Sequence, residues 1–157
     1  MRKSIENFYS IKKKPIIITI DHSLLLKQDA SESSRIETLY KLGNMLAEIR
    51  REMPLAIIIL SQLNRDIESI DRIKQGTIGN YVKDSDVFGA DALLQFTDVL
   101  IGINRPAKYG IELYGPKKYN VDKNTLAIHF LKVRNGDPGF TFFEADFANS
   151  NIYEKKY

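Results

Sequence analysis

The stretch "PIIITID", residues 15–21, is the strongest indication of the fold of this chain. Between Pro15 and Asp21 it contains only isoleucine and threonine, whose β-branched side chains favour strands. A short, uninterrupted apolar run of this kind is typical of a strand buried on both faces, as in the parallel sheets of α/β proteins. We therefore predict a buried parallel strand that ends at Asp21.

The segment that follows this strand predicts a helix and a second strand. Ser34 and Glu37 have the spacing of a capping box at a helix N-terminus, after a short helix expected at residues 2–9. Pro54 marks the end of the longer helix, because proline disfavours helix in the residue before it. The run "LAIIIL", residues 55–60, then has strand length. The order strand, helix, strand predicts an α/β fold with parallel strands.

The rest of the chain predicts further strands separated by irregular segments. "DVLIGI", residues 98–103, is expected to form a third strand, and residues 125–134 and 140–147 a terminal antiparallel pair. Residues 66–88 are polar with little periodicity and are expected to form a long loop or a mobile segment, and residues 104–124 an irregular excursion. The predicted fold is thus α/β, with a mainly parallel sheet and antiparallel C-terminal edge strands.

Composition limits the classes of protein to consider. The 157 residues are 43% hydrophobic and 27% charged, as in an ordinary globular domain or part of one, and the absence of cysteine excludes disulfides and thiolate metal sites. Neither a membrane-spanning run nor a secretory signal is evident. We expect a cytoplasmic protein, a location that these observations allow but do not require. The net charge is +3, with lysine runs at residues 12–14, 117–118 and 155–156 that either attract phosphates or are solvated surface.

Polar residues follow the two apolar runs, where parallel sheets bind their ligands. Asp21 directly follows the first run, as does the Walker B aspartate that holds Mg²⁺, although a polar turn after a strand is the simpler interpretation. Gln62, in "SQLNR", could hydrogen-bond a γ-phosphate or orient water, or the serine and asparagine there could cap a helix. His22 is expected to have a packing or hydrogen-bonding role.

The stretch "LKVRNGDPG", residues 131–139, has two cations on one face of a strand end. Lys132 and Arg134 precede Asn135 and Gly136, which favour a tight turn. Their role is either anion binding or a salt-bridged sheet edge that blocks strand addition. His129, in the apolar run just before them, is expected to be packed rather than a ligand.

Four stretches together resemble the C-terminal RecA-like domain of DnaB-type replicative helicases, in the order of that family and over about residues 15–147. They are "IIITIDHSLLL", "AIIILSQLNR", "SDVFGADALLQFTDVLIGINR" and "LKVRNGDPG". The resemblance implies that residues 1–157 form a partial RecA-like helicase C-terminal domain. It also implies ATP and Mg²⁺ as cofactors, and single-stranded DNA and a homo-oligomeric, hexameric ring as partners, without a membrane.

The resemblance implies roles for single residues. Asp21 looks like the Walker B ligand of the magnesium ion, and Gln62 like the glutamine that senses the γ-phosphate. Arg134 looks like an arginine finger, with Lys132 as its companion, and both reach a phosphate bound by a neighbouring subunit. Residues 66–92 look like the segment that holds DNA in the central channel. The candidate DNA-binding residues there are Phe88, Gly89 and Asp91.

The chain also departs from the family pattern. No G-x-x-x-x-G-K-[ST] phosphate loop occurs, and the family's catalytic glutamate has no counterpart. Phe88 and Gly89 stand where relatives often have Arg-Glu, so Phe88 either stacks on a base or is buried. The phosphate-loop part of the domain is expected to be lacking, with the nucleotide site incomplete and the isolated chain inactive.

Two functions are therefore open. The first is the C-terminal part of an ATP-dependent replicative helicase motor, which couples hydrolysis to translocation on single-stranded DNA and duplex unwinding. The alternative is a non-catalytic, stand-alone module that binds single-stranded DNA or a helicase ring. A RecA-like recombination or regulatory ATPase is a third possibility, but the "KVRNG" ending argues against it.

Overall fold

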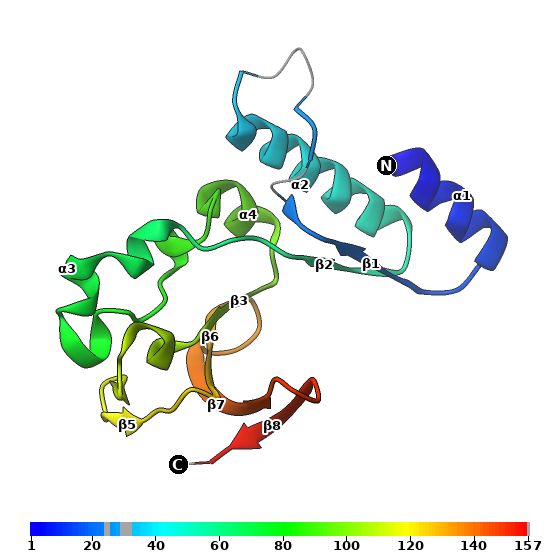
Figure 1. Ribbon diagram of the computed structural model, residues 1–157. Helices are drawn as coiled ribbons and strands as arrows, with labels where there is room; N and C mark the ends of the chain where they lie inside the picture. Colours follow the sequence, from blue (N-terminus) through cyan, green and yellow to red (C-terminus); the bar gives the residue numbers. More distant parts are fainter. Residues whose placement is uncertain (24–25, 29–32, 157) are drawn as a thin grey trace. The chain divides into compact units, whose positions relative to one another are not determined.

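The computed structural model describes residues 1–23, 26–28 and 33–156 (Figure 1). The chain divides into two compact units. The first consists of residues 1–62 and 89–97, and the second of residues 63–88 and 98–157. Each unit is described below by itself. None of the helices in the described residues is long and apolar enough to cross a membrane.

The first unit contains a parallel pair of strands, β1 and β2. Its elements are α1 (Arg2–Lys12), β1 (Ile16–Ile20), α2 (Arg35–Glu52), β2 (Leu55–Ile59) and α4 (Ala90–Phe96). The strands pair in parallel from Ile16 opposite Leu55 to Ile20 opposite Ile59. The predicted strand–helix–strand order is therefore confirmed, and the predicted short N-terminal helix extends to Lys12.

Helix α2 covers one face of this strand pair. Leu42 and Leu46 of α2 form a buried cluster with Ile20 of β1. On the opposite face, the side chain of Ile17 is 73% exposed and that of Ile58 is 50% exposed. Neighbouring residues of a strand point to opposite faces. The prediction of strands buried on both faces is thus wrong for the described part of the chain, since only one face has a helix packed on it.

The ends of α2 follow the predicted signals. The Ser34 hydroxyl accepts the Glu37 N–H at 3.2 Å. The Glu37 carboxylate accepts the N–H of Ser33, at 2.8 Å, rather than that of Ser34, so the second half of the predicted capping box is moved by one residue. At the other end, Met53 has an extended backbone and Pro54 follows it.

Helices α2 and α4 pack closely because two glycines lack side chains at their contact. A Cβ atom on Gly43 of α2 would lie 2.1 Å from Cδ2 of Phe96. Gly89 precedes α4 with a φ of 69°, in the left-handed region that glycine adopts without strain. A Cβ atom on Gly89 would also lie 2.3 Å from Cδ1 of Leu39. This contact fixes α4 on the first unit.

The second unit is built on an antiparallel sheet of order β3-β6-β7-β8 (Figure 1). The strands are β3 (Val99–Asn104), β6 (Thr125–Val133), β7 (Gly139–Asp146) and β8 (Asn151–Lys155), beside the small pair β4 (Leu113–Tyr114) and β5 (Tyr119–Asn120). The predicted third strand and terminal pair are confirmed. The prediction of a mainly parallel sheet is wrong for the described residues, because short connections reverse the chain between β6, β7 and β8, whereas parallel strands need long crossovers.

Residues 66–88 are folded rather than a long loop. They contain short 3₁₀ helices at Arg65–Glu68, Gly76–Ile78 and Asp84–Asp86, and the single-turn helix α3 (Ile70–Ile73). Ile67, Val82 and Val87 are buried. Elements of one turn are too short to show hydrophobic periodicity, so the sequence pattern could not predict them.

Residues 104–124 also supply part of the core. This segment contains a 3₁₀ helix at Pro106–Tyr109 before β4 and β5. Its Tyr114 is fully buried and belongs to one apolar cluster with four other residues, which are Ile111, Val121, Ala127 and Phe142. The predicted irregular excursion is therefore a packed part of the second unit.

Candidate functional site

The carboxyl ends of β1 and β2 lie side by side in the first unit. Past the last paired residues, Leu60 donates its N–H to the carbonyl of Ile20 at 3.0 Å, and Ser23 donates its N–H to that of Leu60 at 2.8 Å. The hydroxyls of Ser23 and Ser61 are hydrogen-bonded at 3.1 Å. Asp21 and Gln62 are exposed in the segments that these bonds join. The structure thus brings both predicted residues to one edge of the strand pair.

The chemistry of this edge fits magnesium bound with a nucleotide. The described residues contain no group of three histidine, cysteine, aspartate or glutamate side chains that could hold a metal ion. Mg²⁺ does not need such a group, because it is usually bound by one or two carboxylates and keeps waters or phosphate oxygens as its other ligands. The exposed carboxylate of Asp21 can supply one such ligand. His22, beside it, is half-buried.

Lys132 and Arg134 lie at the end of β6, beyond its pairing with β7. Lys132 is opposite Leu100 and Phe130 is opposite Ile101, so Leu131 is an extra residue that forms a bulge in β6. Pairing with β7 stops at Phe130, opposite Gly139, so the end of β6 is paired only with β3. A turn follows β6, in which Gly136 donates its N–H to the carbonyl of Val133 at 3.4 Å, so the turn predicted at Asn135-Gly136 is present. The connection then continues to Gly139, where β7 begins. Strand β6 is an inner strand of its sheet, but its last residues project beyond β7.

Arg134 is paired within the chain. Its Nη1 lies 2.6 Å from Oδ1 of Asp98, and its N–H donates to the Asp98 carbonyl at 2.8 Å. This geometry agrees with the salt-bridge interpretation of the sequence. Both side chains are close to half exposed, at 47% and 44%. An ion pair this exposed stabilises a protein by at most about 1 kcal/mol, so it orients Arg134 without preventing its guanidinium from reaching a phosphate.

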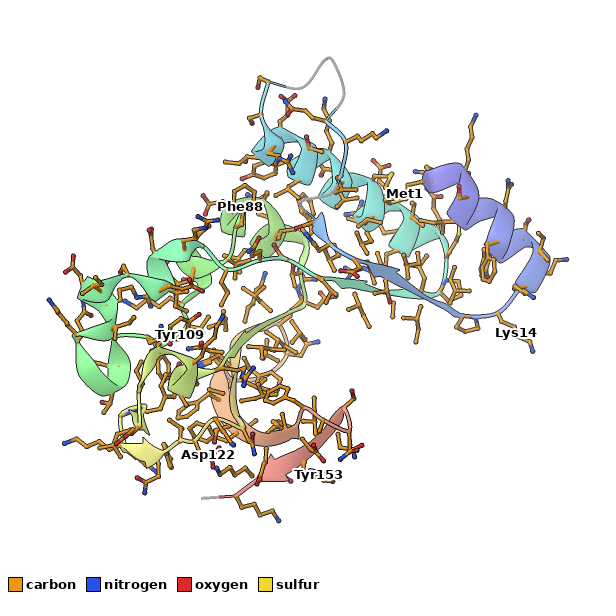
Figure 2. The ribbon with its side chains drawn as sticks, in the orientation of Figure 1. Met1, Lys14, Phe88, Tyr109, Asp122 and Tyr153 are labelled. Carbon is orange, nitrogen blue, oxygen red and sulfur yellow. The ribbon has the colours of Figure 1, made fainter. Side chains whose placement is uncertain are left out.

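The candidate DNA-binding residues lie where the chain passes from the second unit back to the first. Phe88 ends a segment of the second unit and is half-buried (Figure 2). The left-handed backbone of Gly89 explains why glycine stands there. Asp91 is exposed in the first turn of α4, where a carboxylate is favoured by the helix dipole. The backbone conformation at Gly89 and the helix dipole at Asp91 thus explain why these residue types occur there. A role in DNA binding stays a prediction for Phe88, Gly89 and Asp91.

The sequence did not single out Arg72, which organises the segment 79–86. Its Nε donates to the carbonyl of Gly79 at 2.9 Å and its Nη2 to that of Tyr81 at 2.7 Å. Its Nη1 binds the carboxylate of Asp86, which also accepts the N–H of Lys83. The Arg72 side chain is 16% exposed and that of Asp86 is 6% exposed. An arginine in a polar stretch carries no signal that it is buried, so only the fold identifies this ion pair.

A second buried network joins the same segment to the sheet. The Asn80 side chain donates to the carbonyl of Ile67, while the Asn80 carbonyl accepts from Asn104 of β3 at 2.9 Å and from the Tyr114 hydroxyl at 3.0 Å. The same hydroxyl is hydrogen-bonded to Nε2 of His129 at 3.0 Å. His129 is 1% exposed, which confirms that it is packed. These bonds connect residues 67–80 to β3, β4 and β6.

The pH dependence of stability should report on His129. Burial lowers the pKa of His129 to about 4, from an ordinary value of 6.5, so the unfolded chain binds this proton more readily. The free energy of unfolding should therefore fall by about 3 kcal/mol as the pH drops from about 6.5 to about 4. Urea unfolding at several pH values would measure this. The His129→Gln variant should lack most of this slope, and an unchanged slope would contradict the assignment.

The family model "DnaB-like helicase C terminal domain" matches residues 1–150. This chain belongs to that family. The predicted resemblance to DnaB-type helicases is thereby confirmed, and the two strand ends and the β6 end described above are parts of a DnaB-like C-terminal domain.

Two solved structures have the same fold. One, described as an ATPase domain, is 23% identical with a TM-score of 0.73, and the match covers 98% of this chain and 49% of that chain. The other, a DnaB-like replicative helicase described with its interactions with primase, is 22% identical with a TM-score of 0.74, covering 98% of this chain and 33% of that one. The chain thus spans half or less of these proteins. No curated protein sequence matches it.

Proposed function

We propose that this chain is the C-terminal part of the motor of an ATP-dependent replicative DNA helicase, which couples hydrolysis to translocation on single-stranded DNA and to unwinding. The observation that carries this proposal is that hydrogen bonds join the carboxyl ends of β1 and β2. In a DnaB-like C-terminal domain, that edge presents the exposed Asp21 and Gln62 together. ATP and Mg²⁺ are the cofactors that we propose for the assembled protein.

Asp21 and Gln62 have complementary roles in this proposal. Asp21 would hold Mg²⁺, which when bound supplies positive charge to the phosphate oxygens of the nucleotide. Gln62 has an amide that can donate to a γ-phosphate oxygen while its carbonyl accepts from water. Gln62 is the last residue before the second unit, which begins at Leu63. This position, just before the segment 66–92, supports the proposal that Gln62 responds to the nucleotide.

Arg134 and Lys132 act on another subunit in this proposal. They project from the end of β6 past its pairing with β7. Phosphoryl transfer develops charge on the oxygens of the transferred group, and a guanidinium supplied by a neighbour stabilises it. A homo-oligomeric ring, hexameric in the family that the sequence resembles, would bring this pair of cations to the next nucleotide.

The phosphate-cradling residues must come from elsewhere in the assembled protein. The 157 residues contain no G-x-x-x-x-G-K-[ST] motif. The same observation favours the second candidate, a non-catalytic module that binds single-stranded DNA or a helicase ring. Tight binding of an oligonucleotide by the purified chain, together with no effect of any Asp21 or Gln62 variant on hydrolysis by the assembly, would favour the module.

Replacement of Gln62 tests the motor proposal directly. In the assembled protein, Gln62→Ala should remove most of the stimulation of ATP hydrolysis by single-stranded DNA, because alanine has no amide to donate to the γ-phosphate. Hydrolysis measured with and without oligonucleotide gives the ratio. Gln95→Ala removes an exposed glutamine from α4 and is the matched control. Equal stimulation in both variants would refute the sensor role.

A further inference from the structure

The turn after β6 contains two neighbouring residues that can react with each other. Asn135 is followed by Gly136, and this is the only Asn-Gly pair in the sequence. Both residues are exposed, in the connection between β6 and β7 (Figure 1). Asparagine is among the chemically labile residues of proteins. Its side-chain amide can be attacked by the backbone nitrogen of the next residue, and a glycine there hinders the attack least.

We propose that Asn135 is a site of spontaneous deamidation, which converts its side chain to a carboxylate directly after Arg134. The reaction needs neither nucleotide nor DNA, and it uses none of the residues assigned above to the motor. The modification therefore goes beyond the proposed function and does not depend on it.

The reaction consumes only water. The nitrogen of Gly136, once it has lost its proton to hydroxide, attacks Cγ of Asn135 and closes a succinimide ring. The bond from Cγ to Nδ2 breaks, and the amide nitrogen takes up a proton from water and leaves as ammonia. Water then adds to either carbonyl of the ring and opens it, which yields aspartate or isoaspartate. The net change converts an amide and a water to ammonia and a carboxylic acid, which is ionised at neutral pH.

The structure leaves Asn135 and Gly136 weakly restrained. Within the described residues, no hydrogen bond involves the side chain of Asn135. The two residues also lie outside the strand ladders, because pairing of β6 with β3 ends at Val133 and pairing with β7 ends at Phe130. The N–H of Gly136 is 3.4 Å from the carbonyl of Val133, longer than most hydrogen bonds of this type. The attacking nitrogen and the amide can therefore approach each other.

Asn149 lies in another exposed turn but is held in place. Its Nδ2 donates to Oδ2 of Asp146 at 2.7 Å, and its N–H donates to Oδ1 of the same carboxylate at 3.3 Å. The next residue, Ser150, has a side chain that hinders attack by its nitrogen. Ser150 also has a φ of 56°, a backbone conformation that glycine adopts without strain. Asn149 is therefore a control within the same chain, and Ser150→Gly converts it to a second Asn-Gly pair.

Deamidation would reverse the balance of charge at this strand end. Residues 132–137 contain two cations, Lys132 and Arg134, and one carboxylate, Asp137, while the carboxylate of Asp98 is paired with Arg134. A further carboxylate at Asn135 would make the negative charges the more numerous. It would compete with a phosphate for the guanidinium, so we expect it to slow hydrolysis. This consequence, unlike the modification, rests on the proposed function.

Peptide mapping by mass spectrometry of the purified, folded chain tests the modification. After incubation at mildly alkaline pH without nucleotide, deamidation should be found at Asn135 and not at Asn149. Asn135→Gln should abolish the reaction, because a longer side chain does not close the same ring. In Ser150→Gly, Asn149 should still react severalfold more slowly than Asn135, because Asp146 holds its amide. No deamidation at Asn135, or equal rates at the two sites of Ser150→Gly, would overturn the proposal.

Asn135→Asp carries the charge of the product and tests the consequence for hydrolysis. In the assembled protein it should lower DNA-stimulated ATP hydrolysis severalfold, whereas Asn135→Gln should retain most of it. Unchanged hydrolysis by Asn135→Asp, together with a loss in Arg134→Ala, would refute the expected effect of the new charge. Unchanged hydrolysis by both variants would instead count against the proposed function, while the mass spectra decide on the modification in either case.

Discussion

Replacing Arg134 with alanine in the assembled protein should lower DNA-stimulated ATP hydrolysis by about 10³- to 10⁵-fold, the contribution typical of an arginine finger. The affinity of the same subunit for nucleotide should change little, because Arg134 reaches a phosphate held by its neighbour in the proposed ring. Steady-state hydrolysis with single-stranded DNA, together with equilibrium binding of a fluorescent nucleotide, would separate the two effects. Retained hydrolysis would remove the finger assignment.

The ion pair between Arg134 and Asp98 allows a sharper version of this experiment. If that pair were the sole role of Arg134, Asp98→Asn would reproduce the Arg134→Ala phenotype. Because the pair is half exposed, its loss should instead change hydrolysis by less than tenfold. Arg51→Ala removes an exposed arginine at the end of α2 and controls for charge alone. Arg134→Lys keeps the charge but loses the planar fork, and should restore only part of the rate.

Replacing Arg72 with alanine should lower the free energy of unfolding by about 3–5 kcal/mol, the cost typical of removing one partner of a buried ion pair. The change would leave the Asp86 carboxylate, 6% exposed, without its cation. It would also remove the donors that satisfy the carbonyls of Gly79 and Tyr81. Urea denaturation of the purified chain would measure the loss.

Two further variants test the reason for this loss. Arg65→Ala removes an exposed arginine from the same part of the chain and should change stability by less than about 0.5 kcal/mol. Replacing Arg72 with methionine and Asp86 with leucine together should cost less than Arg72→Ala alone, because no charge is then left buried without its partner. A loss below about 1 kcal/mol for Arg72→Ala would contradict the role given to this pair.

Local pattern predicted much of the first unit. The isoleucine-rich runs at residues 16–20 and 57–59 predict strands because their side chains are β-branched. The helix predicted between them is the usual crossover that connects two parallel strands. Ser34 and Pro54 mark the ends of that helix through short-range chemistry, which is why both signals held. The polar residues Asp21 and Gln62 follow the strands directly, so the parallel pairing was enough to bring them to one edge.

The second unit was less predictable. Strand β8 (Asn151–Lys155) is almost wholly exposed and has no apolar alternation, so it is recognised only through its pairing with β7. The segment 66–88 depends on the guanidinium of Arg72 and the amide of Asn80, whose partners lie seven to fourteen and thirteen residues away. Polar contacts of this kind leave no periodic trace in a sequence.

Residue order alone was enough to identify the family, the first two strands with the helix between them, and the residue types available at the strand ends. These depend on interactions between near neighbours in the chain, which composition and spacing record. The folded structure was needed to learn that Arg134 pairs with Asp98, that His129 is buried against Tyr114, and that Arg72 is paired with Asp86. Such contacts depend on how strands distant in sequence pair and pack, and short-range pattern does not specify that pairing.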